Sequence, residues 1–334
     1  MLYLLFINLL LFSYFFRRSM RAFGQIIIQE KLFLPGFDLC RGIFHNSNRL
    51  LFLDFAPLTR MKEELIGLIL ERLEKDADAI KADFHKDKGI PTHYTAIDDF
   101  FPEEIARRIY ESFPPTGKMR LLDSFREKKF TSKNFDDFDP LMKDATFAFQ
   151  DESVVRRVAA LTGIEDPQGD PHLYAGGLSA MTRGHFLQPH IDNSHDYEQK
   201  YYRVLNLLYY VTPGWKAENG GNLELWDKEV TRAVEIPSLF NRLVLMATND
   251  KSYHSVNEVK AEGARCCVSN YYFSPHSPNG YETTHVTYFQ ARPEQTVRRL
   301  VTKVDSDLRS ALRKVIKKGL SKKDLYEGEE GSKK

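Results

Sequence analysis

The chain has 334 residues, which is enough for one large core with or without a small accessory region. Its apolar and charged fractions, 42% and 28%, are ordinary for a folded protein, and a formal net charge of +1 argues against a nucleic-acid partner. The three cysteines are Cys40 and the adjacent Cys266 and Cys267. Neighbouring strand residues point to opposite faces, so this pair does not form a bridge, and a reducing compartment fits best.

The first sixteen residues are almost wholly apolar and are followed by Arg17, Arg18 and Arg21. One interpretation is a short signal-anchor, although the run is shorter than the roughly 17–25 residues of a spanning helix. We favour a translation start at Met20 or Met61, or a disordered leader. The expectation is therefore a cytoplasmic protein with an uncertain apolar leader at 1–60, attached to a membrane only if residues 1–16 are a real anchor.

From Met61 the chain shows helical periodicity, with apolar residues at Leu65, Ile66, Leu68, Ile69 and Leu73. The elements expected next are a helix at 61–84, a strand at 94–98, a helix at 102–113 opened by proline, a long charged loop at 116–150 that folds over a site, and a helix at 151–161. Residues 61–170 are thus predicted to be a helical and irregular region that packs on a core.

After His172 the period changes to short apolar runs separated by turn signals, at 173–180, 202–211, 222–226, 232–236, 242–246 and 265–273. Strands at this spacing predict a sandwich or barrel, which we place at 171–290. An apolar stripe after Pro293 predicts a C-terminal helix at 291–320, followed by a charged tail at 321–334. The fold class is therefore mainly β with flanking helices.

His190 and Asp192 stand two positions apart at the end of an apolar strand. Residues i and i+2 of a strand share a face, so both side chains are able to bind one cation. A lone His-x-Asp is a weak signal, but His254 follows at another strand-like run. Two imidazoles and one carboxylate form the facial triad of non-haem Fe(II) oxygenases, which leaves positions open for a co-substrate and oxygen.

Arg265 opens an apolar strand eleven residues after His254. A guanidinium in an otherwise buried strand is costly unless it meets an anion, and a dicarboxylate such as 2-oxoglutarate would provide one through a bidentate pairing. The alternative is an arginine at the rim that pairs with Glu258 or Glu262. Taken together with the triad, the bound dicarboxylate is the interpretation that we favour.

Several blocks occur in a characteristic order: His190–Asn193, Leu208–Trp215, Gly220–Leu225, Asn241–Val244, His254–Val256 and Arg265. On these blocks, the stretch from about Met181 to Phe273 resembles the 2-oxoglutarate/Fe(II) oxygenases of the prolyl 4-hydroxylase type, including the hypoxia-factor prolyl hydroxylases. The resemblance implies a double-stranded β-helix (jelly-roll) core with the metal at its mouth. It also implies Fe(II) held by the triad, 2-oxoglutarate and O2 as co-substrates, and ascorbate that sustains the iron as Fe(II).

The same resemblance implies that Tyr210 assists Arg265 with the distal carboxylate and that Leu208 and Leu223 line the pocket. One departure concerns a tyrosine that the family often carries about ten residues before His-x-Asp. Here residues 180–182 are Ala-Met-Thr, so this contact is lost or another side chain supplies it. The carboxylate of Asp192 is retained, which favours hydroxylation over halogenation.

The prediction is therefore a dioxygenase that hydroxylates a peptide or small-molecule substrate and releases succinate and CO2. Prolyl peptides, free amino acids and other small metabolites all stay open as substrates, and the sequence does not predict the oligomeric state. Two other classes of protein are considered. One is a non-catalytic β-barrel sensor that binds metal and 2-oxoglutarate, and the other is a zinc hydrolase, against which Arg265 argues.

Overall fold

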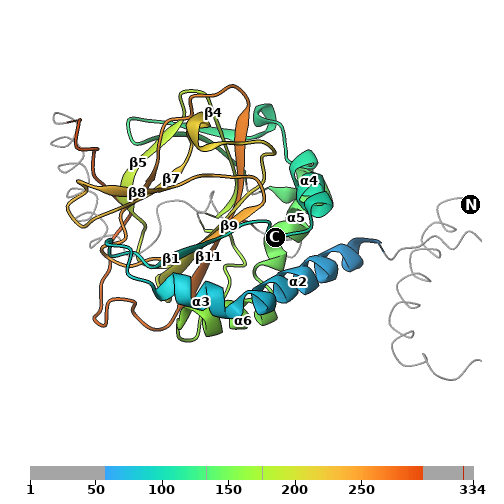
Figure 1. Ribbon diagram of the computed structural model, residues 1–334, viewed down its shortest axis with the longest axis horizontal. Helices are drawn as coiled ribbons and strands as arrows, with labels where there is room; N and C mark the ends of the chain where they lie inside the picture. Colours follow the sequence, from blue (N-terminus) through green and yellow to red (C-terminus); the bar gives the residue numbers. More distant parts are fainter. Residues whose placement is uncertain (1–56, 133, 175, 296–325, 327–334) are drawn as a thin grey trace, which may run out of the picture. The chain divides into compact units, whose positions relative to one another are not determined.

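The computed structural model describes residues 57–132, 134–174, 176–295 and 326 (Figure 1). The predictions for the apolar leader before residue 57, and for the helix and charged tail after residue 295, lie outside the described residues apart from Tyr326. Within the described ranges, none of the helices has both the length and the apolar character that crossing a membrane requires.

The described α-helices gather on one side of the sheet, where Figure 1 shows α2, α3 and α6 beside β1, β9 and β11. Their bounds are α2 Pro57–Lys75, α3 Ala77–His85, α4 Glu103–Glu111, α5 Pro140–Ala148 and α6 Glu152–Thr162. The predicted helix at 61–84 is two helices, because the backbone of Asp76 leaves the helical region at φ −108° and ψ 18°. Aspartate is a poor residue for a helix interior, which fits a break at this position. The other two predicted helices are confirmed within two residues.

The prediction of a long loop at 116–150 is wrong. This stretch contains a β-hairpin, β2 (Arg120–Asp123) and β3 (Glu127–Ser132), followed by α5. The hairpin has no apolar alternation, because one face of β3 lines a polar cavity. Helix α5 carries a recognisable start, since the Asp139 side chain accepts a hydrogen bond from the Leu141 backbone N–H at 2.9 Å and Pro140 occupies the first turn.

The strands form one strongly folded antiparallel sheet in two halves. One half has the order β9-β6-β11-β4 with β1 at its outer end, and the other has the order β5-β10-β7-β8. The bounds are β1 Tyr94–Ile97, β4 Gly177–Thr182, β5 Phe186–Ile191, β6 Tyr202–Tyr210, β7 Leu223–Trp226, β8 Ala233–Ile236, β9 Arg242–Ala247, β10 His254–Val256, β11 Ala264–Ser274 and β12 Tyr288–Phe289.

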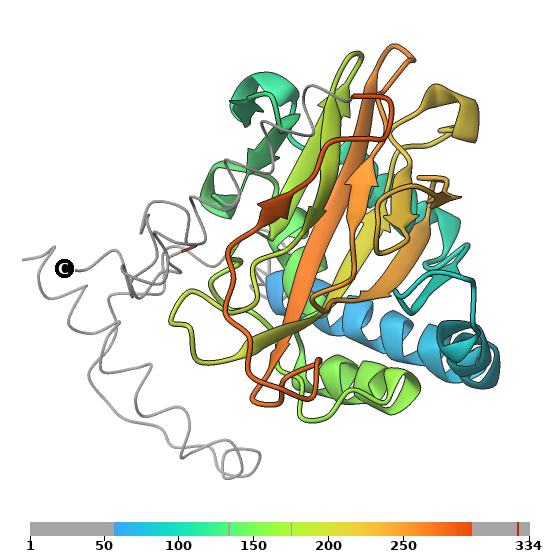
Figure 2. The ribbon, with the colours of Figure 1, turned by 90° about the vertical axis from the view of Figure 1, so that its left-hand side faces the viewer.

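Consecutive strands of the chain mostly alternate between these two halves, and β3 joins them by pairing with both β4 and β5. The long strand β11, orange in Figure 2, pairs with β4 on one side and β6 on the other. This interleaving is that of a double-stranded β-helix. The predicted fold class, a jelly-roll core with flanking helices, is confirmed.

Strand β6 shows how the fold separates core from cavity. Leu205, Leu207 and Tyr209 belong to the buried cluster that includes α2, α5 and α6. The intervening Asn206, Leu208 and Tyr210 line a cavity on the other face. Strand β11 divides in the same way, since Cys266 joins the helix-side core while Cys267 lines the cavity. Both cysteines are free, as expected from their alternate directions.

Candidate metal and co-substrate site

The three predicted metal ligands lie together at the open end of the β5–β10 pair. His190 of β5 is the direct register partner of His254 of β10, and Asp192 follows the end of β5. His190 Nε2 lies 3.6 Å from Asp192 Oδ1, and His254 Nε2 lies 3.5 Å from Asp192 Oδ2. One ligand atom from each residue falls within 4.8 Å of the others, so the cluster is compact enough to hold one ion.

Both imidazoles are oriented through their other ring nitrogen. His190 Nδ1 lies 2.9 Å from the Gln188 carbonyl oxygen, and His254 Nδ1 lies 3.0 Å from that of Ser252. A carbonyl only accepts, so each Nδ1 carries the proton and each Nε2 presents its lone pair to the shared space. Burial and the neighbouring imidazole lower the pKa of His254 to about 4, which keeps this ring neutral. Two imidazoles and a carboxylate are a donor set that suits Fe(II).

Asp192 is held from behind by two side chains of β6. Asn206 Nδ2 donates to Asp192 Oδ2 at 2.8 Å, and Arg203 Nη1 lies 3.3 Å from the same oxygen. Burial alone would raise the pKa of Asp192, but the Arg203 guanidinium and the two imidazoles outweigh it and hold the pKa well below its usual range. The carboxylate is therefore ionised and fixed in place.

Arg203 contacts the candidate site, and the sequence pattern did not single it out. Its side chain is 1% exposed, and its guanidinium lies 4.1 Å from the Tyr271 ring centroid and 5.6 Å from that of Phe273. Among the described residues, Asp192 is its ion-pair partner. The signal was present in the sequence: Arg203 stands near the start of an apolar strand, as Arg265 does, and the same cost of burying a guanidinium applies.

We expect Arg203→Met to weaken metal binding, because Asp192 would lose both its compensating charge and one of its two supports. Outer-shell partners of metal ligands typically contribute about 10–100-fold to affinity. Calorimetric titration of Mn(II) into the folded variant measures the loss. Arg183→Met is the matched control, since Arg183 is exposed and pairs with Glu262 away from the cavity. Equal Mn(II) affinity in the two variants would contradict a supporting role for Arg203.

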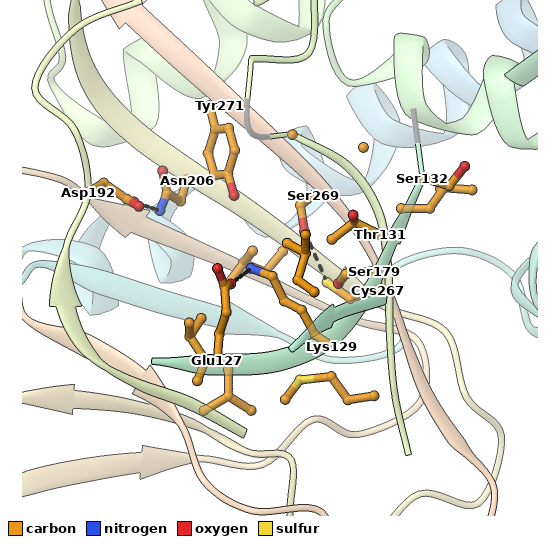
Figure 3. Close-up of a pocket in the computed structure, with 18 of the residues that line it drawn as sticks. Glu127, Lys129, Thr131, Ser132, Ser179, Asp192, Asn206, Cys267, Ser269 and Tyr271 are labelled. Atoms are coloured by element: carbon orange, nitrogen blue, oxygen red, sulfur yellow. Dashed lines mark hydrogen bonds and ion pairs between the residues drawn. The ribbon is translucent and has the colours of Figure 1, made fainter. Parts of the chain in front are cut away.

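The triad opens into a cavity of about 780 Å³. Figure 3 shows its walls: Glu127, Lys129 and Thr131 point inward from β3, facing Cys267 and Ser269 of β11. Lys129 Nζ lies 3.0 Å from Glu127 Oε2. The interior is thus polar on the β3 side, and the metal ligands occupy one end of it.

Arg265 lines this cavity. The residue is 4% exposed, its Nε donates to the Gly221 carbonyl at 3.0 Å, and its guanidinium lies 4.9 Å from the Tyr210 ring centroid. The Tyr210 hydroxyl is buried and makes no well-formed hydrogen bond in the described part of the chain, although the Ser238 side chain is near enough to lower its pKa. No carboxylate of the described residues pairs with Arg265. A buried guanidinium beside this hydroxyl fits a bound carboxylate.

The rim alternative for Arg265 is wrong, because the residue is buried and Glu262 pairs with Arg183 instead. Leu208 lines the cavity as predicted, but Leu223 needs a correction. Leu223 packs in a cluster with Tyr210 and Leu225 and does not line the cavity, because its side chain is covered by that cluster. It supports Tyr210 from behind.

The cavity wall near Arg265 is built from other side chains than the tyrosine that the family often carries upstream. Met181 of β4 is the register partner of Arg265 and lines the cavity. The polar groups beside it are Ser179 and, on the paired strand β3, Thr131 and Lys129. Strand β3 has no apolar alternation by which it could be predicted, because one of its faces lines the polar cavity.

A jelly roll with a His-Asp-His cluster at its open end, and a buried arginine beside it, is the arrangement expected of a 2-oxoglutarate-dependent oxygenase. Residues 176–273 match the family model described as the 2OG-Fe(II) oxygenase superfamily. This match covers a little under a third of the chain and includes the triad, Arg265 and Tyr210. Residues 176–273 are therefore the part of the chain that is similar to this superfamily.

One curated relative is a prolyl hydroxylase. Prolyl 3-hydroxylase OGFOD1 of Mus musculus is 34% identical over 89 residues, which cover 24% of this chain and 16% of that protein. The chain thus matches about one sixth of the length of this curated relative.

Similar solved structures include a prolyl-4-hydroxylase of Pseudomonas putida, with 13% identity, TM-score 0.45, and coverage of 59% of this chain and 98% of that one. A prolyl hydroxylase of Trichoplax adhaerens, in complex with a hypoxia inducible factor peptide fragment, has 18% identity, TM-score 0.38, and coverage of 65% and 92%. HygX of Streptomyces hygroscopicus, with nickel, 2-oxoglutarate and hygromycin B bound, has 12% identity, TM-score 0.39, and coverage of 58% and 92%.

Proposed function

We propose that this protein is a 2-oxoglutarate- and O2-dependent Fe(II) dioxygenase that hydroxylates a peptide or small-molecule substrate. The observation that carries the proposal is the shared cavity of the triad and the Arg265–Tyr210 pair. A metal site alone would also suit a hydrolase. A buried guanidinium and a buried hydroxyl that face the same cavity support an anionic co-substrate.

His190, Asp192 and His254 would hold Fe(II) through Nε2 and carboxylate atoms that their neighbours already orient. Bound Fe(II), with 2-oxoglutarate and O2, would supply the oxidising chemistry that inserts one oxygen atom into a substrate C–H bond and releases succinate and CO2. Arg265 would bind the distal carboxylate of 2-oxoglutarate through its planar fork, and Tyr210 would donate its hydroxyl proton to the same group.

Burial raises the pKa of Tyr210, so its hydroxyl stays protonated and is able to donate a hydrogen bond. Leu208 lies on β6 between Asn206 and Tyr210, on the face that lines the cavity. It would place an apolar surface between the carboxylate end and the metal end, where bulk water has to be excluded. Arg203 would keep Asp192 ionised and in position throughout.

The test is succinate release. Purified protein is loaded with Fe(II) and 2-oxoglutarate without oxygen, mixed with a library of peptides and metabolites, and exposed to oxygen. We expect succinate to form only when Fe(II), 2-oxoglutarate and oxygen are all present. Tight 2-oxoglutarate binding without succinate in any mixture would instead support the non-catalytic sensor. Turnover with Zn(II) that ignores 2-oxoglutarate would support the hydrolase.

A further inference from the structure

A short strand that follows the superfamily match covers the edge of the metal-bearing strand. This strand is β12, the darkest orange arrow in Figure 2, and it lies outside residues 176–273. Its Phe289 is the register partner of His190 on β5, and the Gln290 backbone N–H donates to the Pro189 carbonyl at 2.8 Å. The hairpin strand β3 pairs with the opposite end of β5. Among the described strands, β12 is therefore the one that covers this edge of β5 at His190.

Phe289 also contacts the metal ligand through its side chain. Its ring stacks on the His190 imidazole, with 5.1 Å between centroids and 20° between planes, and both side chains line the cavity. The hydrogen bond between His190 Nδ1 and the Gln188 carbonyl fixes one atom of the imidazole. A stacked ring restrains the plane of the imidazole as well. The plane decides the direction in which the lone pair of Nε2 points.

A two-residue strand makes too few hydrogen bonds to hold a position by itself, so β12 depends on its attachments. Before it, the Ser194 backbone N–H donates to the His285 carbonyl at 3.0 Å, and the His285 N–H donates to Ser194 Oγ at 2.9 Å. After it, Arg292 stands three residues from Phe289 and forms an ion pair with Glu224, in which its side chain is 13% exposed. The segment is therefore attached on both sides of β12.

The Arg292 attachment lies on the outer face of β7 and β10. Arg292 Nη1 donates to Glu224 Oε1 at 2.9 Å and Nη2 donates to Oε2 at 2.5 Å, so a planar fork meets a buried carboxylate. Ser255 Oγ donates to the same Oε2 at 2.5 Å and accepts a hydrogen bond from Trp226 Nε1 at 2.7 Å. Ser255 follows His254 on β10 and points away from the cavity. The attachment therefore joins β12 to the strand that carries the second imidazole.

The chemistry of this attachment favours positioning over stability. Desolvation of two buried charges offsets much of their attraction, so a buried ion pair is weak evidence for a contribution to stability. What the fork between Arg292 and Glu224 adds is a defined distance and direction. A defined geometry matters here because the segment ends, three residues earlier, on the ring that contacts His190.

We propose that Arg292 is a positioning residue for the metal ligand His190. It acts through Phe289: by fixing the end of the segment to Glu224, it holds the aromatic ring against the imidazole and so sets the direction of Nε2. This inference rests on the proposed function for the identity of the metal but not for turnover.

The test measures Mn(II) affinity by calorimetry and the visible absorption of bound Co(II), both on the full chain with Arg292→Gln. Glutamine keeps hydrogen-bonding capacity but loses the charge and the fork. We expect Mn(II) to bind about tenfold more weakly, at the lower end of what partners of metal ligands contribute. The Co(II) bands should shift, because the ligand field depends on the direction of the His190 lone pair. Arg292→Lys should recover part of the loss.

Arg242→Gln is the matched control. Arg242 forms a similar fork on Asp98 with 12% of its side chain exposed, and its strand β9 pairs with β1 and β6. This variant should lower the melting temperature of the metal-free protein but leave Mn(II) affinity and the Co(II) bands unchanged. The same result for Arg292→Gln would overturn the proposal, because Arg292 would then support only the fold. If Arg292→Gln does not fold, E224Q combined with R292Q removes both buried charges and carries the same expectation.

Phe289→Leu tests the route through the ring, because it removes the stacking and keeps the backbone pairing of β12. It should weaken Mn(II) binding, and adding R292Q should cause little further loss, since both changes act on one contact. Losses that add fully, or wild-type affinity in Phe289→Leu, would overturn the proposal. Since these measurements need no turnover, Mn(II) binding as expected without any succinate release would contradict the proposed function alone.

Discussion

Alanine in place of His190, Asp192 or His254 is expected to abolish tight binding of Mn(II) or Fe(II). Within the described residues the cluster supplies three ligand atoms, and two ligands would leave most of the coordination to water. Asp192→Ala has a second consequence, because Arg203 then loses its ion-pair partner in the described chain and leaves an uncompensated charge. Turnover should disappear in all three variants.

Anaerobic titration with Mn(II), followed by calorimetry or electron paramagnetic resonance, measures this effect directly. Circular dichroism on the same samples shows whether each variant has folded. His276→Ala is the matched control, because His276 is exposed, pairs with Asp166 and does not line the cavity. Normal Mn(II) binding in two of the three triad variants would end the assignment of the metal site.

Arg265→Ala should weaken the affinity for 2-oxoglutarate by about 2–5 kcal/mol, the usual loss when one member of a buried charge pair is truncated. Tyr210 alone would then face the distal carboxylate. Metal affinity should hardly change, since Arg265 is outside the triad. Arg265→Lys should recover only part of the loss, because an ammonium keeps the charge but not the planar fork.

The measurement is a calorimetric titration of 2-oxoglutarate into Mn(II)-loaded protein without oxygen. Arg265 packs against Gly221, where a Cβ in place of the glycine hydrogen would lie 3.5 Å from Arg265 Cγ, so alanine at position 265 also removes packing. Arg265→Met keeps most of that volume and serves as the second variant. Wild-type affinity in both the Ala and Met variants would place the carboxylate elsewhere, and lost Mn(II) binding in both would show that Arg265 supports the fold.

The sequence predicted the jelly roll and brought the three triad residues together correctly. Short-range rules account for a β-rich sandwich or barrel and for the shared face of His190 and Asp192, because residues two apart in a strand point the same way. The jelly roll itself was implied by the family resemblance. His254 was added because it stands at another strand-like run, and the ordered series of blocks supported that choice. The geometry of His190 against His254 then followed from the pairing of β5 with β10.

The cavity wall opposite β11 was not predictable in the same way. Strand β3 faces a polar cavity, so Glu127, Lys129 and Thr131 replace the apolar alternation by which strands are recognised. Leu223 was misplaced for the opposite reason: an apolar residue in a strand suits a pocket wall and a core equally well, and only the register decides between them. The cost of burying a guanidinium marks Arg203 in the sequence, but it does not reveal that Asp192 is its partner, because a loop separates the two residues in the chain.

Strand β10 is only three residues long, and it lies between β5 and β7 with His254 as its first residue. An ion bound by both His190 and His254 would connect β5 and β10, two paired strands that are distant in the chain. Metal that binds the folded chain better than the unfolded one adds to the free energy of unfolding. The same ion would therefore stabilise the pairing of β5 with β10. Cellular iron supply would then affect the lifetime of the folded protein.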